Sequence, residues 1–308
     1  MYKRQRLHWT LLTLPILGIV IFTILPLVFM ICMAFTSYSK VGDHLTIFHW
    51  VGLKNFSTVL GMGNSIGKTF WSVLGWTLIW AVLATFLNYI LGMILAIVIN
   101  RKTTRIKGFW RFCFMLSAAI PQFVSLLLMR TMLKDNGLIN NLLVQAGLIS
   151  SPLPFLTNAT WARATVVIIN LWVGIPFTMM QVTGILQNIP GELYEAARVD
   201  GAGPVTIFFK ITLPYMLFVT TPYLITTFTG NINNFNVIYL LTAGAPVPVG
   251  ATAGKTDLLV TWLYKLTVDL QYFNVGAVVG ILTFVILAVV SLITYRNTGS
   301  YKNEEGFQ

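Results

Sequence analysis

Charge is what this sequence has least of. Charged residues occupy 9% of its 308 positions, whereas a typical soluble domain carries about 25%. Hydrophobic residues make up 56%, and the mean hydropathy is +0.78. This composition excludes a water-soluble globular domain and indicates that lipid is the main solvent of the chain. The length fits several spans with short loops, so we expect one membrane domain over residues 1–308.

Cysteine and histidine are also scarce, with two and three residues. The two cysteines, Cys32 and Cys113, lie inside apolar runs, which argues against a disulfide framework and predicts buried small hydrophobes. The three histidines are too scattered to form a metal-ligand set. The net charge of +11 is not gathered on one soluble face, so a nucleic-acid partner is not expected. We predict that the chain binds no metal and no cofactor.

The sequence also lacks an energy source of its own. There is no G-x-x-x-x-G-K-[ST] loop, and Gly201 and Gly203 have no neighbouring lysine and hydroxyl to hold a phosphate. Ion-coupled carriers place ionisable residues inside the membrane, but here Lys68, Arg130 and Arg163 lie only at the ends of apolar runs. We expect those side chains to reach the interface. With no catalytic constellation either, the sequence predicts a protein that is not an enzyme.

What the chain has instead is apolar runs long enough to cross a bilayer. We predict six transmembrane helices, at about 9–35, 69–99, 109–129, 164–189, 215–242 and 272–295. The first run is too long for a signal peptide, so we interpret it as a membrane helix. Prolines within the runs predict kinks.

The distribution of lysine and arginine predicts the orientation. An even number of spans places both termini on one side, and that side holds the majority of the 20 basic residues. They are Lys3, Arg4, Arg6, Arg101, Lys102, Arg105, Lys107, Arg111, Arg198, Lys210, Arg296 and Lys302. We therefore expect a multi-pass membrane protein with cytoplasmic N- and C-termini.

The predicted cytoplasmic loop at about 190–214 has a local pattern of helix, turn and helix. Pro190 ends the preceding span, glycines around Gly201 break the run, and Pro204 fits the first position of a new helix. Ala196 and Ala197 allow another surface to approach the backbone closely. These features fit a docking element, but the residues alone fit an ordinary interfacial loop equally well.

The loop resembles the signature of permease subunits of bacterial ATP-binding-cassette importers, which is E-A-A, three residues, G, nine residues and I-x-L-P. Glu195-Ala196-Ala197, Gly201 and Ile211-x-Leu213-Pro214 match it at every spacing. The resemblance implies a type I importer permease fold with cytoplasmic coupling helices that dock on a separate ATPase. By that resemblance, the coupling residues are Glu195, Ala196, Ala197, Asp200, Gly201, Leu213 and Pro214.

Asparagines are unusually frequent inside the predicted fourth and fifth spans. Amides are costly there unless hydrogen-bonded, so their clustering predicts a polar cavity. Amides that donate and accept, next to aromatic rings, suit a neutral polyhydroxylated ligand better than an ion. Hydrogen bonds between helices are the alternative for any single amide. The amides and rings are Asn170, Asn231, Asn233, Asn234, Asn236, Trp172, Phe177 and Phe235.

The chain is most similar to the sugar-importing, maltose/maltodextrin-type branch of these permeases, which belong to the binding-protein-dependent transport system inner membrane component family. The stretches that carry this similarity are 51–56, 170–176, 231–235 and 256–260. The resemblance implies sugar-binding positions at Asn170, Val173, Gly174, Phe177, Thr227, Gly230, Asn231 and Asn234. Gly230 departs from the branch pattern, which has an aromatic ring at that position.

The resemblance also implies partners: a second homologous permease subunit, two ATPase subunits that use ATP and magnesium, and an extracytoplasmic sugar-binding protein. We expect the stretch from Ala243 to Lys255 to reach toward that binding protein or its sugar. The expected cargo is maltose or maltodextrin, with galacto-oligosaccharide as the alternative. Two other classes stay open, an ion-coupled carrier and a membrane scaffold that transports nothing.

Overall fold

The computed structural model describes residues 2–39, 49–101 and 103–296, and the elements in these ranges are helices. Lys102 and the tail with Lys302, both used for the predicted orientation, lie outside the described residues. The α-helices are α1 (Tyr2–Ile19), α2 (Leu25–Ala34), α3 (Lys54–Leu60), α4 (Ser65–Val82), α5 (Asn88–Asn100), α6 (Lys107–Ala119), α7 (Gln122–Met132), α8 (Leu138–Gln145), α9 (Ala159–Gln187), α10 (Gly191–Val199), α11 (Pro204–Ile207), α12 (Leu213–Ile232), α13 (Phe235–Thr242), α14 (Leu259–Tyr264) and α15 (Phe273–Arg296). Short π-helical turns are η1 (Val20–Ile24), η2 (Leu83–Leu87), η3 (Phe208–Thr212) and η4 (Lys265–Asp269).

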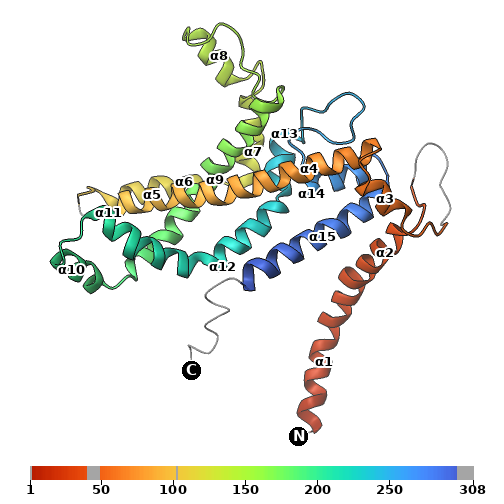
Figure 1. Ribbon diagram of the computed structural model, residues 1–308, viewed down its shortest axis with the longest axis horizontal. Coiled ribbons are helices and arrows are strands. Elements are labelled where there is room, and N and C mark those ends of the chain that lie inside the picture. Colours follow the sequence, from red (N-terminus) through yellow and green to blue (C-terminus); the bar gives the residue numbers. More distant parts are fainter. Residues whose placement is uncertain (1, 40–48, 102, 297–308) are drawn as a thin grey trace. The chain divides into compact units, whose positions relative to one another are not determined.

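The predicted all-helical membrane architecture is confirmed. Among the described residues, 5 helical stretches are long and apolar enough to cross a membrane, or 6 if the bent pair α6 and α7 is counted as one span. The turns η1 and η2 join their flanking α-helices, so α4, η2 and α5 form one long rod from Ser65 to Asn100 (Figure 1). The predicted first, second, fourth and sixth spans therefore correspond to observed helices.

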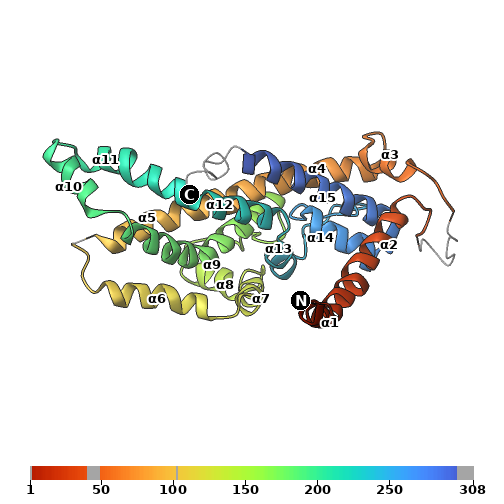
Figure 2. The same ribbon diagram turned by 90° about the horizontal axis from the view of Figure 1, so that it is seen from below.

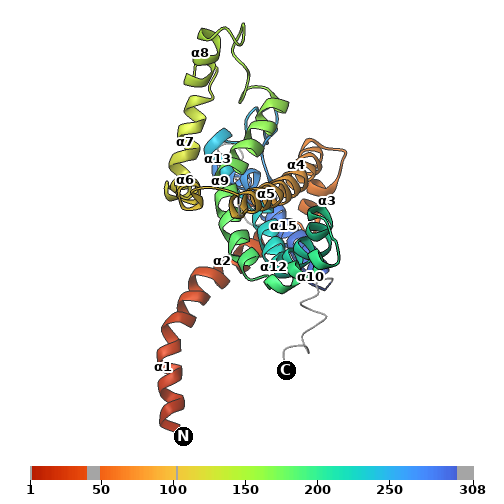
Figure 3. The same cartoon turned by 90° about the vertical axis from the view of Figure 1, so that its left-hand side faces the viewer.

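The predicted third span, 109–129, is not one straight helix. Helices α6 and α7 meet at an angle of 84° (Figure 3). Pro121 causes the break, because the ring of a proline disfavours helical geometry in the residue before it, and Ile120 is accordingly extended with ψ of 128°. The sequence predicted a kink at this position, and the structure shows two separate helices.

The predicted fifth span, 215–242, is wrong at both ends. Its helix begins at Pro204 and runs through α11, η3 and α12 to Ile232 (Figure 2). It stops there because Asn233 leaves helical geometry and the side chain of Asn234 accepts a hydrogen bond from Val237 N, which starts α13 as a new helix.

The chain divides into two compact units, and the prediction of a single domain remains a prediction. The first unit comprises Met1–Trp71 and Trp262–Phe284. In it, the Asn55 amide donates to the carbonyls of Ala34 (2.9 Å) and Thr36 (2.8 Å) and accepts from Asn274 Nδ2 (3.2 Å). A buried asparagine thus fastens the end of α2 to α3 and to the start of α15.

The second unit comprises Ser72–Thr261 and Val285–Gln308 and contains the candidate sites. Its core has one cluster around Trp80, Leu126 and Ile238 and another around Met93, Met179 and Met216. Helices α5 and α9 approach closely because Gly92 has no side chain, and a Cβ there would lie 2.7 Å from Thr178. This contact fixes the second and fourth spans against each other.

One expectation about single residues is wrong. Cys32 and Cys113 are exposed within the chain rather than buried, since α2 and α6 turn apolar faces outward, which suits lipid. That Arg163 reaches the membrane interface stays a prediction, and the structure adds its contacts within the chain. Its Nε donates to the Lys255 carbonyl (2.9 Å), and its guanidinium lies 4.6 Å from the centre of the Trp76 ring.

Candidate functional site

Helix α10 carries the E-A-A motif, and Gly201 determines how this helix ends. Gly201 has φ of +76°, a left-handed conformation that favours glycine. Its N–H bonds to Arg198 O (3.0 Å), and Ala202 N bonds to Ala197 O (2.8 Å). These two bonds form a Schellman motif, which satisfies carbonyls that the helix end leaves without partners. The spacing between E-A-A and G therefore has a local structural cause.

The two faces of α10 differ in exposure. Tyr194 and Ala197 are half-buried and turn toward the rest of the unit, and the Tyr194 hydroxyl lies 3.2 Å from Thr212 Oγ1. Glu195 and Ala196 are exposed, and Val199 is 87% exposed. The structure thus separates the two alanines, since only Ala196 is available to a partner surface.

Val199 is a candidate docking residue that the sequence analysis missed. An exposed apolar side chain four residues after Glu195 was the available signal, because residues four apart share one helix face. Asp200 is exposed at the C-cap, and the Glu192 carboxylate in the first turn and Arg198 in the last turn both favour the helix dipole.

The last predicted coupling residues, Leu213 and Pro214, belong to the long helix rather than to a second short helix. Pro214 has no N–H to donate to the carbonyl of Lys210, and the wider turn η3 directly precedes it. Leu213 is half-buried and packs against the cluster around Met93. These two residues shape the junction between loop and span, so the predicted pair of short angled helices is corrected to one.

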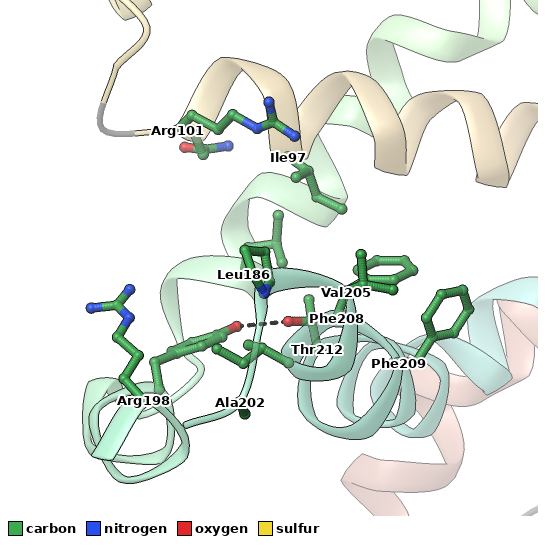
Figure 4. Close-up of a pocket in the computed structure, with 13 residues that line it drawn as sticks. Ile97, Arg101, Leu186, Arg198, Ala202, Val205, Phe208, Phe209 and Thr212 are labelled. Atoms are coloured by element: carbon green, nitrogen blue, oxygen red, sulfur yellow. Dashed lines mark hydrogen bonds between the residues drawn. The ribbon is translucent and has the colours of Figure 1, made fainter. Parts of the chain in front are cut away.

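A cavity of about 670 Å³ lies between this junction and the ends of α5 and α9 (Figure 4). The coupling loop therefore borders a hollow rather than packing solidly on the bundle. Its lining residues are Ile97, Asn100, Arg101, Leu186, Tyr194, Arg198, Ala202, Pro204, Val205, Ile207, Phe208, Phe209 and Thr212. None of the predicted sugar positions is among them.

Two of the predicted sugar positions, Asn231 and Asn234, belong to a polar cluster in the second unit. The Asn231 Nδ2 donates to Thr85 Oγ1 (2.9 Å), and its Oδ1 accepts from Asn234 Nδ2 (3.4 Å). The indole N–H of Trp80 donates to the Asn231 carbonyl (3.1 Å). Asn231 is only 8% exposed, so it joins the second span to the fifth. At this position the hydrogen bonds between helices proposed as the alternative are present.

Asn88 was missed, although it is an amide within the second span. It lies three residues after Thr85, directly after the π-helical turn η2, and its Nδ2 is so close to Gly174 that a Cβ at Gly174 would overlap it. Its Oδ1 is buried and has no hydrogen-bond partner among the described residues. The rule that flagged the other amides would have found it had it been applied to every span.

The remaining predicted sugar residues differ in exposure. Asn170 is buried at 8% exposure, whereas Phe177 is 57% exposed. Val173, Gly174 and Thr227 are half-buried, and Gly230 is exposed. The structure thus joins Asn231 and Asn234 to Thr85 and places Gly174 against Asn88, while Phe177 and Gly230 present open surface.

The loop from Ala243 to Leu258 is held by its own side chains. Asp257 is fully buried and accepts from Gly254 N (2.6 Å) and Thr261 Oγ1 (2.9 Å). Thr256 Oγ1 bonds to Thr242 Oγ1 (2.8 Å) and donates to the Ala245 carbonyl (2.8 Å). At its tip, Val249 is fully exposed. The loop is a fixed projection with an apolar end.

A model of the family described as binding-protein-dependent transport system inner membrane component matches residues 88–298. The chain belongs to this family. The matched range includes α10, Gly201 and the amides from Asn88 onward, while Trp80 and Thr85 lie just before it. As a transport-system membrane component the chain is not an enzyme, as the sequence predicted.

Curated relatives of this inner membrane component cover nearly the whole chain. The galactooligosaccharides transport system permease protein GanP of Bacillus subtilis (strain 168) is 38% identical over 294 residues, which are 94% of this chain and 70% of the relative. The maltodextrin transport system permease protein MdxF of the same organism is 37% identical over 310 residues, covering 96% and 70%. The maltose/maltodextrin transport system permease protein MalF of Escherichia coli (strain K12) is 35% identical over 253 residues, 80% of this chain and 49% of that one.

Solved structures agree on the fold. A chain of a bacterial ABC transporter involved in the import of the acidic polysaccharide alginate superimposes with a TM-score of 0.74, covering 96% of this chain and 95% of that chain at 24% identity. A second structure, the alginate ABC transporter in complex with an alginate pentasaccharide-bound periplasmic protein, gives a TM-score of 0.74 at 23% identity, covering 95% and 93%. The permease fold predicted from the sequence is therefore confirmed.

The candidate site has no arrangement for metal chemistry in the part of the chain that the structure describes. Among those residues no group of three or more His, Cys, Asp or Glu side chains is placed to hold a metal ion. Its chemistry is that of amides, hydroxyls and rings within a bundle, with an exposed helix at one end.

Proposed function

We propose that this inner membrane component is a permease subunit of an ATP-driven importer that moves an oligosaccharide, with maltodextrin as the first candidate, into a bacterial cell. The observation that carries the proposal is α10, an exposed helix closed by Gly201 and matching the coupling signature of ATP-binding-cassette permeases. Maltodextrin permeases among the relatives support the cargo. Galacto-oligosaccharide is the second candidate, because GanP is 38% identical and MdxF 37%, so identity does not separate the two.

The proposed assembly contains a second homologous permease subunit, two ATPase subunits and an extracytoplasmic sugar-binding protein. The first span supports a large partner or lipid contact, since only 6% of its most apolar window is buried inside this chain. The projection that ends in Val249 supports a contact with the binding protein. ATP and magnesium act on the ATPase subunits, and this chain binds neither. Both termini and α10 face the cytoplasm in this proposal.

Coupling would run from α10 into the fifth span. ATP-driven closure of the ATPase pair moves α10, and the Tyr194–Thr212 contact passes that movement to the helix that continues to Ile232. The far end of the same helix holds Asn231, which is bonded to Thr85 of the second span. One continuous helix therefore links the ATPase contact to the amide cluster, so the two can change state together.

Reconstituted importer in sealed vesicles tests this function. We expect ATP-dependent uptake of labelled maltotriose when the binding protein is present, and loss of uptake with Glu195→Lys, which reverses a charge on the exposed face of α10. Preferred uptake of galactotriose would select the second candidate. Uptake that persists without any ATPase subunit would refute an ATP-driven importer in favour of an ion-coupled carrier, and normal uptake with Glu195→Lys would refute docking through this helix.

A further inference from the structure

The cavity beneath α10 has a chemistry that the proposed transport path does not use. Its walls are mainly apolar and aromatic and include Ile97, Leu186, Val205, Phe208 and Phe209. Two guanidinium groups, Arg101 and Arg198, complete the lining, and no carboxylate belongs to it. An occupant that matches both features has apolar chains and a negative charge.

The two arginines differ from their basic neighbours. Lys107 Nζ donates to the Asn100 carbonyl (3.1 Å), and Arg111 Nη2 donates to Asn100 Oδ1. Within the ranges that the structure describes, the side chains of Arg101 and Arg198 have no such partner, and both are exposed. They line the cavity from different elements, Arg101 at the end of α5 and Arg198 in the last turn of α10 (Figure 4).

The cavity also lies at the ends of candidate membrane spans. It is bordered by the ends of the second and fourth spans and by the start of the helix that contains the fifth, and lipid head groups gather where spans end. Phe209 and Val205 are exposed beside it and offer apolar surface to acyl chains. A soluble anion would leave this apolar wall uncovered, whereas an amphiphile covers it.

We propose that the cavity binds an anionic phospholipid, with its phosphate between Arg101 and Arg198 and its acyl chains along Phe208 and Phe209. The lipid joins the end of α5 to α10 and so steadies the coupling helix. Coupling to the ATPase then depends on anionic lipid in the membrane. This inference rests on the proposed function only for the last step and for the cytoplasmic side, because lipid binding itself requires no transport.

Lipid retention by the assembled importer tests the site directly. The complex is equilibrated with vesicles of equal parts phosphatidylglycerol and phosphatidylcholine, extracted in detergent, and its bound lipid is counted by native mass spectrometry. We expect phosphatidylglycerol on the wild type and about 30-fold weaker binding with R101Q/R198Q, about 5-fold for each arginine. R101K/R198K keeps both charges and retains most of the lipid.

The matched control is R105Q/K210Q, which also removes two charges, one in the loop that follows α5 and one in η3, at exposed residues that do not line the cavity. It retains wild-type amounts of phosphatidylglycerol. Equal retention by the two double variants would overturn the site, and displacement of the lipid by inorganic phosphate alone would overturn a lipid occupant. With the wild-type importer in nanodiscs, we expect phosphatidylglycerol to raise the ATP hydrolysis that the binding protein stimulates, and we expect R101Q/R198Q to abolish that increase. If transport fails while retention follows the arginines, the proposed function falls and the lipid site stands.

Discussion

Replacing Gly201 by serine separates the conformation of the coupling loop from its chemistry. Gly201 has φ of +76°, and a Cβ built there meets nothing within 4 Å, so the penalty comes from the backbone alone. A residue with a Cβ in the left-handed region costs about 1–2 kcal/mol. That amount disfavours the closed end of α10 by about 5–30-fold. Gly203→Ser is the matched control, because Gly203 has φ of −74° at a helix N-cap, where serine is favoured.

The assay is ATP hydrolysis by the reconstituted importer, stimulated by sugar-loaded binding protein, together with the amount of ATPase subunit that copurifies. We expect Gly201→Ser to reduce both toward background and Gly203→Ser to leave both near wild type. Gly201→Asn should be intermediate, since asparagine tolerates the left-handed region better than most residues. Equal activity of Gly201→Ser and Gly203→Ser would refute the argument that the Schellman turn sets the orientation of α10.

Three further changes test other contacts. Tyr194→Phe removes the hydroxyl contact with Thr212 and should lower stability by about 1 kcal/mol, raising the ATP consumed per sugar transported; unchanged stoichiometry would argue against transmission through this contact. Gly174→Ala overlaps Asn88, so it should cost about 1–3 kcal/mol of stability and lower the thermal midpoint, and Gly174→Ala/Asn88→Ala should restore that midpoint. No recovery would mean that a neighbour other than Asn88 causes the overlap. Asn231→Ala and Thr85→Val both break one bond between helices, but only the first removes a predicted sugar contact, so uptake should fall much further with Asn231→Ala; equal losses would assign Asn231 to helix packing alone.

Hydropathy located the spans but not the ends of the helices, and the fifth span shows why. Lys210 and the preceding glycines set the predicted start at 215, yet the helix begins at Pro204. A charged residue indicates where water begins, whereas a helix continues through water until its backbone is interrupted. Pro214 lies within the continuous helix, and the π-helical turn η3 shortly before it accommodates the missing N–H. Such a compensation depends on the backbone of five residues together and is not visible in the residue order.

Asn55, in the predicted outer stretch 51–56, has a structural role that the sequence did not indicate. In the sequence that stretch served as a mark of the sugar-importing branch. In the structure, Asn55 bonds the carbonyls of Ala34 and Thr36 and accepts from Asn274, a residue 219 positions away. Spacing along the chain carries no information about such a distant partner, which is why local reasoning identified the stretch but not its role.

The amides of the membrane region present the same limit in a sharper form. An amide has two N–H donors and two acceptor lone pairs, whether it joins helices or holds a sugar. Asn231 uses one donor toward Thr85 and one acceptor toward Asn234, so half of its side-chain capacity is left for a hydroxyl. Asn88 Oδ1 is buried without a partner among the described residues, and such an acceptor is costly unless something donates to it. A sugar hydroxyl has one O–H to donate, so neighbouring hydroxyls of one sugar can serve Asn88 Oδ1 and Asn231 Oδ1 separately, which makes the second span, and not only the fourth and fifth, part of the path we propose.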